Sequence, residues 1–107
     1  MPYLLVNIYF PPHKGQEIGK KTLEVFQKFP EDPSIAKRVL QGAVMRTKNG
    51  ILSMSVSEIP EGKLEEAIDR TNELLDAFSE IEGVNAEVLT VATLVEAMEM
   101  IGLKMPS

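Results

Sequence analysis

Few side chains in this sequence could support chemistry, and they do not form a recognised catalytic pattern. The chain of 107 residues contains one histidine, His13, and no cysteine. Histidine exchanges protons near neutral pH, so His13, in a predicted loop after Pro12, is a candidate acid or base at the mouth of a cavity. The alternative is a solvated loop side chain. One histidine without cysteine is a poor start for a metal site, and we expect neither a metal nor a cofactor.

Three serines alternate along one strand-like segment, at Ser53, Ser55 and Ser57. A nucleophilic serine needs a base beside it and an acid that orients the base. The sequence places no histidine near these serines, so we expect no serine hydrolase and assign no catalytic residue. Their hydroxyl groups remain candidates for hydrogen bonds to a small ligand or to a partner subunit.

Composition argues against several kinds of partner. The formal net charge of −5 is unfavourable for nucleic acids, whose affinity depends on clustered lysine and arginine. No apolar run reaches the roughly 18 residues that a membrane-spanning helix needs. The first residues lack the basic segment of a signal peptide. We therefore expect one cytoplasmic domain, residues 1–107, that binds neither nucleic acid nor membrane.

The spacing of apolar residues predicts the elements that must position these side chains. Alternation predicts strands over 3–10, 40–48, 51–59 and 85–92, and helical spacing predicts helices over 13–29, 63–78 and 94–102. Ser34 could begin a further short helix that ends at 37 or 38. Thr93 and Glu96 fit a capping box at the start of the last helix.

The order of these elements is βαββαβ followed by one C-terminal helix. It predicts an α+β fold, a ferredoxin-like βαββαβ two-layer sandwich with an antiparallel sheet, and right-handed crossovers favour the strand order 4-1-3-2. Both long helices would cover one face of the sheet. The first strand would turn Leu4, Val6, Ile8 and Phe10 toward them.

The Asn49-Gly50 pair predicts a two-residue hairpin turn of type I′, which places Lys48 opposite Ile51. One side of the hairpin is then apolar and the other carries serines and Arg46. We expect the apolar side to face the helices. It comprises Ala43, Met45, Leu52, Met54 and Val56, whereas the other side comprises Gly42, Val44, Arg46, Ser53, Ser55 and Ser57.

The sheet face away from the helices is expected to carry the serine side of the hairpin and, next to it, the side of the first strand that does not meet the helices. An exposed patch of aromatic, aliphatic and hydroxyl groups usually has a partner, and the simplest partner is the same face of a second copy. A pocket between two such faces could bind a small amphipathic ligand; the alternative is a plain interface. The candidate ligand-binding or interface residues are Tyr3, Asn7, Tyr9, Arg46, Ser53, Ser55 and Ser57.

The element order, size and character of the faces resemble the dimeric α/β-barrel superfamily over the whole chain. This resemblance implies a homodimer joined sheet face to sheet face, often with added C-terminal contacts. Asn7 could match the first-strand asparagine of its haem-degrading members. The chain has no tryptophan, however, and His13 lies where those enzymes do not place their ligand, so haem degradation is not expected.

We therefore expect a homodimer of the dimeric α/β-barrel type, and the semi-polar second sheet face suggests that it binds a small amphipathic ligand between the two faces. One alternative is a cofactor-independent monooxygenase or isomerase acting in the same pocket. Another is a regulatory module similar to the amino-acid-binding ACT domains, which share the topology. Such modules bind ligands at subunit interfaces near the first strand–helix loop, here residues 11–15.

Overall fold

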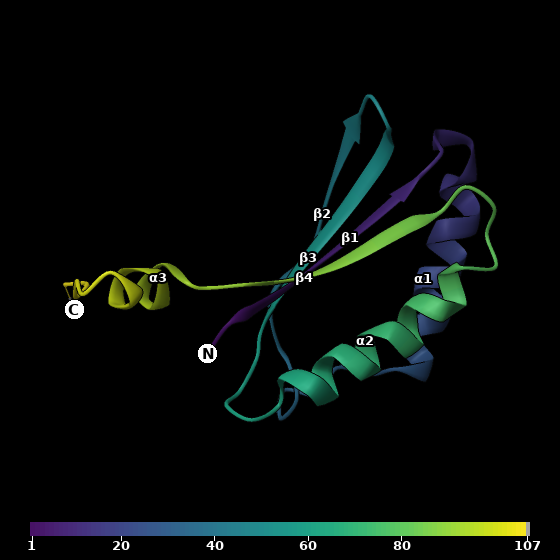
Figure 1. Cartoon of the computed structure of the whole chain (residues 1–107). Helices are drawn as coiled ribbons and strands as arrows, with labels where there is room; N and C mark the ends of the chain where they lie inside the picture. The colour runs from purple at the N-terminus through teal and green to yellow at the C-terminus, as the bar shows by residue number, and fades with distance from the viewer. Residues whose placement is uncertain (107) are drawn as a thin grey trace.

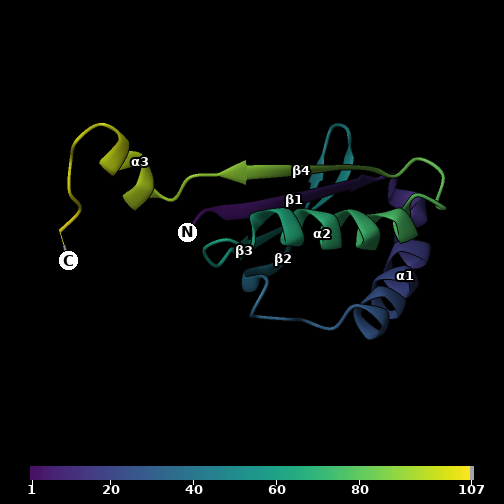
Figure 2. The same cartoon turned by 60° about the horizontal axis from the view of Figure 1, so that its bottom comes forward.

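A four-stranded antiparallel sheet forms one layer of the protein, and two long helices form the other (Figures 1 and 2). The computed structural model describes residues 1–106. The strands are β1 (Tyr3–Phe10), β2 (Lys37–Thr47), β3 (Gly50–Glu58) and β4 (Asn85–Val91); the helices are α1 (Gly15–Lys28), α2 (Leu64–Phe78) and α3 (Leu94–Met100), with a 3₁₀ turn, η1 (Pro12–Lys14), before α1. The sheet order is β2-β3-β1-β4. This confirms the predicted α+β ferredoxin-like fold and strand order.

The core lies between the sheet and the two long helices and has two parts. Phe10 packs with Val25 of α1 and Phe78 of α2 in one cluster. Leu4 packs with Ala67 of α2 and with Ile59, which is fully buried, in the other. Because Leu4 and Phe10 both belong to this core, the face of the first strand that was predicted to meet the helices is confirmed.

The hairpin turn is not the predicted type I′ turn. Thr47 pairs with Gly50, so the two turn residues are Lys48 and Asn49. No non-glycine residue of the described chain has a positive φ, whereas type I′ needs positive φ at both turn positions. Gly50 takes the positive value instead, with φ 114°. It also approaches the first strand closely, because a Cβ atom there would lie 2.7 Å from the carbonyl oxygen of Phe10.

The predicted orientation of the hairpin is wrong. The observed turn shifts the register of the hairpin by two residues, and an even shift keeps the same residues together on each side. The pairing of β3 with β1, however, places Ser55 opposite Val6 and Met54 opposite Asn7. Side chains opposite each other in an antiparallel ladder lie on one face. The serine side therefore faces the helices with Val6, and the methionine side is uncovered.

Two isoleucines explain why the serine side turns inward. Ile51 and Ile59 have the same alternation as the serines between them. Ile51 packs against the core cluster of Phe10, and Ile59 belongs to the cluster of Leu4. Burial of these two large side chains, at about 1.5–3 kcal/mol each, fixes the orientation of the whole strand.

The predicted short helix after Ser34 is also wrong. Ser34 donates hydrogen bonds to Asp32 Oδ1 from its backbone N–H (3.1 Å) and its hydroxyl (2.6 Å). The backbone N–H groups of Ile35 and Ala36 donate to the Asp32 carbonyl at 3.0 Å. Asp32 thus organises a turn, and β2 begins directly after it at Lys37. The register of β2 with β3 then shifts twice, between Arg38 and Leu40 and between Leu40 and Ala43.

Candidate functional site

A cavity of about 150 Å³ lies between the sheet and the helices. Its walls come from β1, β3, α1, α2, the start of β2 and the loop between α1 and β2. Most of the lining is aliphatic or aromatic. The lining residues are Leu4, Val6, Ile8, Thr22, Val25, Phe26, Phe29, Pro30, Glu31, Asp32, Ile35, Ala36, Arg38, Gln41, Ser53, Ser55, Ser57, Ala67, Arg70, Thr71, Leu74 and Phe78.

Small side chains at the centre of β3 border the cavity. Ser53, Ser55 and Ser57 lie opposite Ile8, Val6 and Leu4 of the neighbouring strand, and all three line the cavity. Ile51 and Ile59 fill the core at the two ends of this row. The short serine side chains leave the middle unfilled.

The hydroxyl groups of this serine row have no protein partner. Within residues 1–106, the serine hydroxyls that form side-chain hydrogen bonds are those of Ser34 and Ser79. The cavity therefore offers three free donor and acceptor groups on an otherwise largely apolar wall. A hydroxyl that loses water without gaining another partner is unfavourable by about 1–3 kcal/mol, so an occupant with a polar group would be favoured.

Two arginines line the cavity and lie against phenylalanine rings of its walls. The guanidinium group of Arg70, on α2, donates to the carbonyl of Pro30 and lies 6.0 Å from the ring centre of Phe29. The guanidinium group of Arg38 lies 6.0 Å from the ring centre of Phe26 on α1. The pKa of Asp32 in the loop between α1 and β2 is lowered, mainly by the hydrogen bonds from Ser34 and less by the charge of Arg70.

The other side of the sheet, which we call the open face, is covered by no helix of the described chain. It is largely apolar, and several of its aliphatic side chains are exposed, among them Leu40, Met45, Leu89 and Val91. The register of the three ladders places the following residues on it: Tyr3, Leu5, Asn7, Tyr9, Lys37, Leu40, Ala43, Met45, Leu52, Met54, Val56, Glu58, Asn85, Glu87, Leu89 and Val91.

One polar cluster interrupts the open face. Asn7 Nδ2 donates to Glu87 Oε1 at 3.2 Å, and the hydroxyl of Tyr9 donates to the same oxygen at 3.5 Å. Asn7 is 8% exposed, and its Oδ1 atom is buried without a hydrogen-bond partner within the described residues. Glu87 was not among the candidates, because its contact with Asn7 depends on a ladder that joins residues 80 positions apart in the sequence.

The structure divides the predicted site between two faces. Tyr3, Asn7 and Tyr9 lie on the open face, as expected, whereas Ser53, Ser55 and Ser57 lie on the helix side. Arg46 pairs with Ile51, and so belongs to the helix side, but does not line the cavity. The predicted grouping of all seven residues on one face is wrong, since the β1–β3 register gives the serines the opposite orientation. His13 is exposed in η1 and does not line the cavity either.

Several cavity residues were missed by the sequence reasoning. Arg38, Gln41, Phe26 and Leu74 line the cavity but were assigned to no site. A signal was available in the pattern Ile51-x-Ser-x-Ser-x-Ser-x-Ile59, in which large apolar residues bracket a row of small polar ones. In residues 1–106 no group of three or more metal-binding side chains is gathered, and no helix there has the length and apolar character to cross a membrane.

Comparisons with known proteins add little to this geometry. No family model matches the sequence, and no curated protein matches it. Among solved structures, a formyltetrahydrofolate deformylase from Pseudomonas putida KT2440 is similar, with a TM-score of 0.46 and 8% sequence identity. The similarity covers 83% of this chain and 28% of the deformylase, so the chain spans less than a third of that protein.

Proposed function

We propose that this protein binds a small amphipathic molecule in the cavity between its sheet and its helices. The observation that carries this proposal is the serine row of β3, whose three hydroxyl groups face a largely apolar cavity without protein partners. Ligand sites are typically apolar with a few placed polar groups. The proposed site therefore lies between the sheet and the helices of one chain, and not between the sheet faces of two copies as the sequence suggested.

The cavity limits the size of the ligand. An apolar cavity of about 150 Å³ accepts a single benzene ring; the cavity here has the same volume, is partly open to solvent and has serines on one wall. We therefore propose a ligand of one ring or a short chain that carries a hydroxyl or a similar neutral hydrogen-bonding group. Phenol and toluene form a matched pair of probes, because they have nearly the same shape and differ in one polar group.

We also propose that two copies join through their open faces, as in the dimeric α/β-barrel type. The support is the apolar character of this face, together with exposed Leu89 at 41% and Met45 at 53%. The observed orientation of the hairpin strengthens this support, because it places Leu52, Met54 and Val56 on the open face where three serines were predicted. The dimer would leave both cavities on the outer sides of the paired sheets.

The ligand proposal is tested by titrating phenol and toluene into the protein and following amide NMR shifts. Phenol should bind about fivefold more tightly than toluene, since one hydrogen bond adds about 1 kcal/mol. Ser55→Ala should remove most of this preference, and Ser79→Ala, at the end of α2 and outside the cavity lining, should not. Shifts that are absent, or that fall outside the cavity lining, would refute the proposal.

The cavity lining and a thermal-shift measurement with amino acids separate the alternatives. The monooxygenase or isomerase reading expected a pocket lined by Tyr3, Asn7, Tyr9 or Arg46, and none of these lines the cavity. The ACT-like reading places a ligand near residues 11–15. Thermal stabilisation by an amino acid that survives Ser55→Ala and is lost in His13→Ala would favour that reading over ours.

A further inference from the structure

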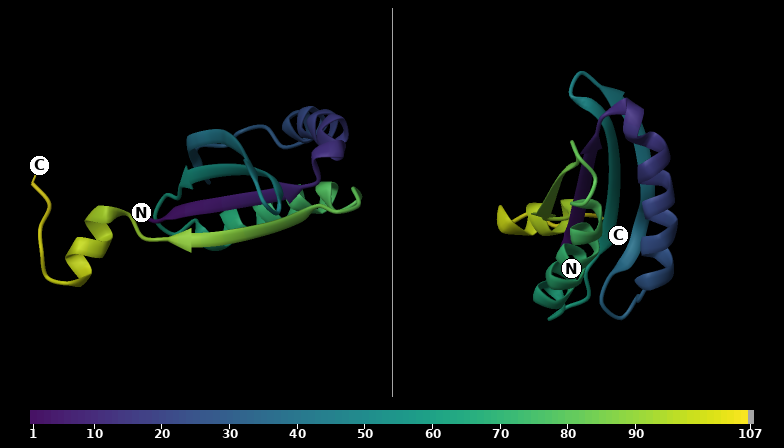
Figure 3. Two further views of the ribbon diagram at one scale, coloured as in Figure 1. Left: turned by 90° about the horizontal axis from the view of Figure 1, so that it is seen from above. Right: turned by 90° about the vertical axis from the view of Figure 1, so that its right-hand side faces the viewer.

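The C-terminal arm, residues 92–106, stands apart from the two-layer body. It continues beyond the end of β4, and α3 lies away from the sheet and from both long helices (Figures 1 and 3). The radius of gyration is 15.3 Å, whereas a compact chain of this length has about 13 Å. The arm meets its own body at its root, where the Met1 amino group pairs with Glu96 Oε2 at 3.1 Å, and from there α3 extends beyond the sheet (Figure 1).

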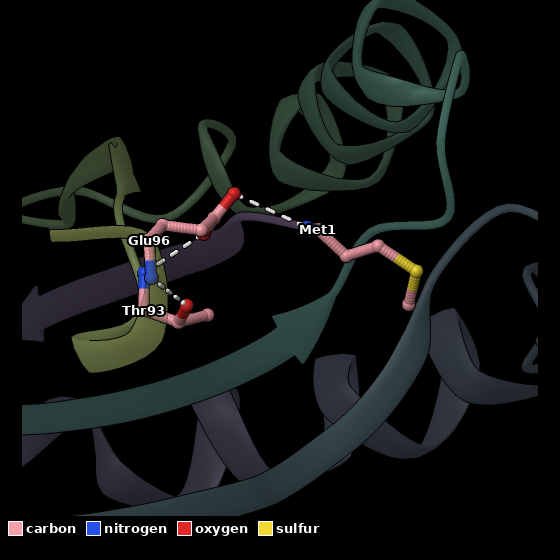
Figure 4. A network of polar contacts seen from close by, with 3 residues as sticks. All are labelled: Met1, Thr93 and Glu96. Atoms are coloured by element: carbon pink, nitrogen blue, oxygen red, sulfur yellow. Dashed lines mark hydrogen bonds and ion pairs between the residues drawn. The ribbon is translucent and has the colours of Figure 1, made fainter. Parts of the chain in front are cut away.

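Both ends of α3 are specified by the sequence of the arm itself. At the start, Glu96 N–H donates to Thr93 Oγ1 (3.1 Å) and Thr93 N–H donates to Glu96 Oε1 (2.9 Å), which is the predicted capping box (Figure 4). At the end, Gly102 has φ 79°. There Gly102 N–H donates to the Glu99 carbonyl (3.0 Å), and Leu103 N–H to the Met98 carbonyl (2.9 Å). This is a Schellman motif.

A helix so short needs a surface to pack against. Isolated helices below about 12–15 residues are marginal in water, and α3 has 7 residues. Its apolar residues Leu94, Met98 and Ile101 recur at helical spacing and form one stripe. Leu94 is 63% exposed and Ile101 is 69% exposed, so within the described chain this stripe is largely uncovered.

The area of the open face shows why a second copy fits the arm. Four strands about 4.8 Å apart, each with about 8 residues at 3.4 Å, give a face of about 500 Å². A standard stable interface buries about 800 Å² on each partner. The arm and the surface it covers would add about 200–300 Å² per copy, because a 7-residue helix is about 10 Å long and 10 Å wide. The paired faces and the arm together approach the area of a stable dimer.

Charge also favours a second copy. Two copies carry −5 each and repel one another unless they meet where charge is sparse. The open face has that property, and the stripe of Leu94, Met98 and Ile101 has no charged member. Val91 at the end of β4 is exposed next to the arm, so the apolar surface runs from the sheet into α3.

We propose that the C-terminal arms are exchanged between the two copies of a homodimer, each docking its stripe on the margin of the other copy's open face. This inference rests on the proposed pairing of the open faces. It adds that α3 belongs structurally to the neighbouring subunit.

The test is hydrogen–deuterium exchange of the arm amides 97–103 in the full chain, at concentrations above and below the dimer midpoint found by ultracentrifugation. If the arms are swapped between subunits, the protection of these arm amides should rise about tenfold or more as dimers form. Met54→Arg, on the open face, should remove this protection while α2 stays protected. Equal arm protection in monomer and dimer would overturn the inference, because the arm would then gain no contact from the second copy.

A matched pair of substitutions tests the stripe itself. Ile101→Asp should weaken dimerisation about tenfold or more, whereas Glu99→Gln, outside the stripe, should leave it unchanged. If the full chain is dimeric but Ile101→Asp dimerises normally, arm exchange fails and face pairing stands. If the full chain is monomeric at every concentration, both fail.

Discussion

Val6 and Ser55 lie directly opposite each other in the β1–β3 ladder, and both side chains line the same cavity. Their neighbours Asn7 and Met54 are also opposite each other, on the other face. One step along β3 therefore separates a residue of the candidate ligand site from a residue of the candidate dimer interface. The two proposed functions of the sheet can be tested independently.

Substituting arginine at these adjacent positions should have opposite effects. Met54→Arg places a charge on the open face and should weaken dimerisation about 100-fold. Ser55→Arg should fill the cavity, abolish phenol binding and leave the dimer intact. Light scattering over a concentration series and phenol titration check both. Loss of the dimer in Ser55→Arg would show that the assignment of the two faces is wrong.

Gly50→Ala should destabilise the protein by about 1–3 kcal/mol. Gly50 has φ 114°, and its added Cβ atom would lie 2.7 Å from the Phe10 carbonyl oxygen. Gly42→Ala, in the neighbouring strand, is the control, since nothing lies within 4 Å of its Cβ position. It should change the free energy of unfolding by less than about 0.5 kcal/mol. Urea unfolding of both variants measures the difference.

Ile59→Ala should be among the more damaging core truncations. Ile59 is fully buried between Leu4 and Ala67, and removing such a side chain destabilises by about 2–5 kcal/mol. Val44→Ala makes a suitable comparison because Val44 is 68% exposed on edge strand β2. If both variants lower the midpoint of thermal unfolding by the same amount, the core cluster of Leu4, Ile59 and Ala67 does not stabilise the fold in the way proposed.

The helical structure of the arm should weaken in acid. The pKa of Glu96 is lowered, first by the hydrogen bond from the Thr93 backbone N–H and then by the one from the Met1 amino group (Figure 4). Because the pKa of Glu96 is lowered in the folded state, its ionised carboxylate stabilises the arm at pH values above the ordinary glutamate pKa of about 4.3. This contribution is lost as pH falls through the lower folded value.

Amide exchange of residues 97–103 between pH 6 and about pH 3 would show the loss, after correction for intrinsic exchange rates. Glu96→Gln should remove much of the pH dependence, because glutamine also serves in a capping box and carries no charge. An arm that responds to pH identically in the variant would exclude this mechanism.

Local signals in the sequence predicted the elements, and one long-range contact decided the faces. The alternation of Leu4, Val6, Ile8 and Phe10 correctly predicted the covered side of β1, and Thr93 with Glu96 correctly predicted the cap of α3. The orientation of β3 depends on its pairing with β1 across more than 40 residues. No turn connects these two strands, so no local signal in the sequence sets their register. The inner side of β3 was therefore predicted from hydrophobicity alone.

That choice failed because hydrophobicity does not say whether an apolar side meets its own helices or another molecule. The side with Met45 and Met54 is the more apolar side of the hairpin, yet it lies outside. The serine side is inside because Ile51 and Ile59 hold it there. The cavity could not be predicted from the serines alone, since its other walls come from α1, α2 and the loop around Asp32.

The two register shifts in β2 have a consequence for how this protein can assemble. A straight edge strand of 11 residues would be a template on which further chains could add, strand by strand, without limit. Bulges interrupt the hydrogen-bonding row of such an edge and twist it away, and here they fall between Arg38 and Ala43. Growth of fibrils from this edge is thereby disfavoured. In the proposed dimer, by contrast, the open face would be covered completely by the second copy, so association through it would end at a closed pair.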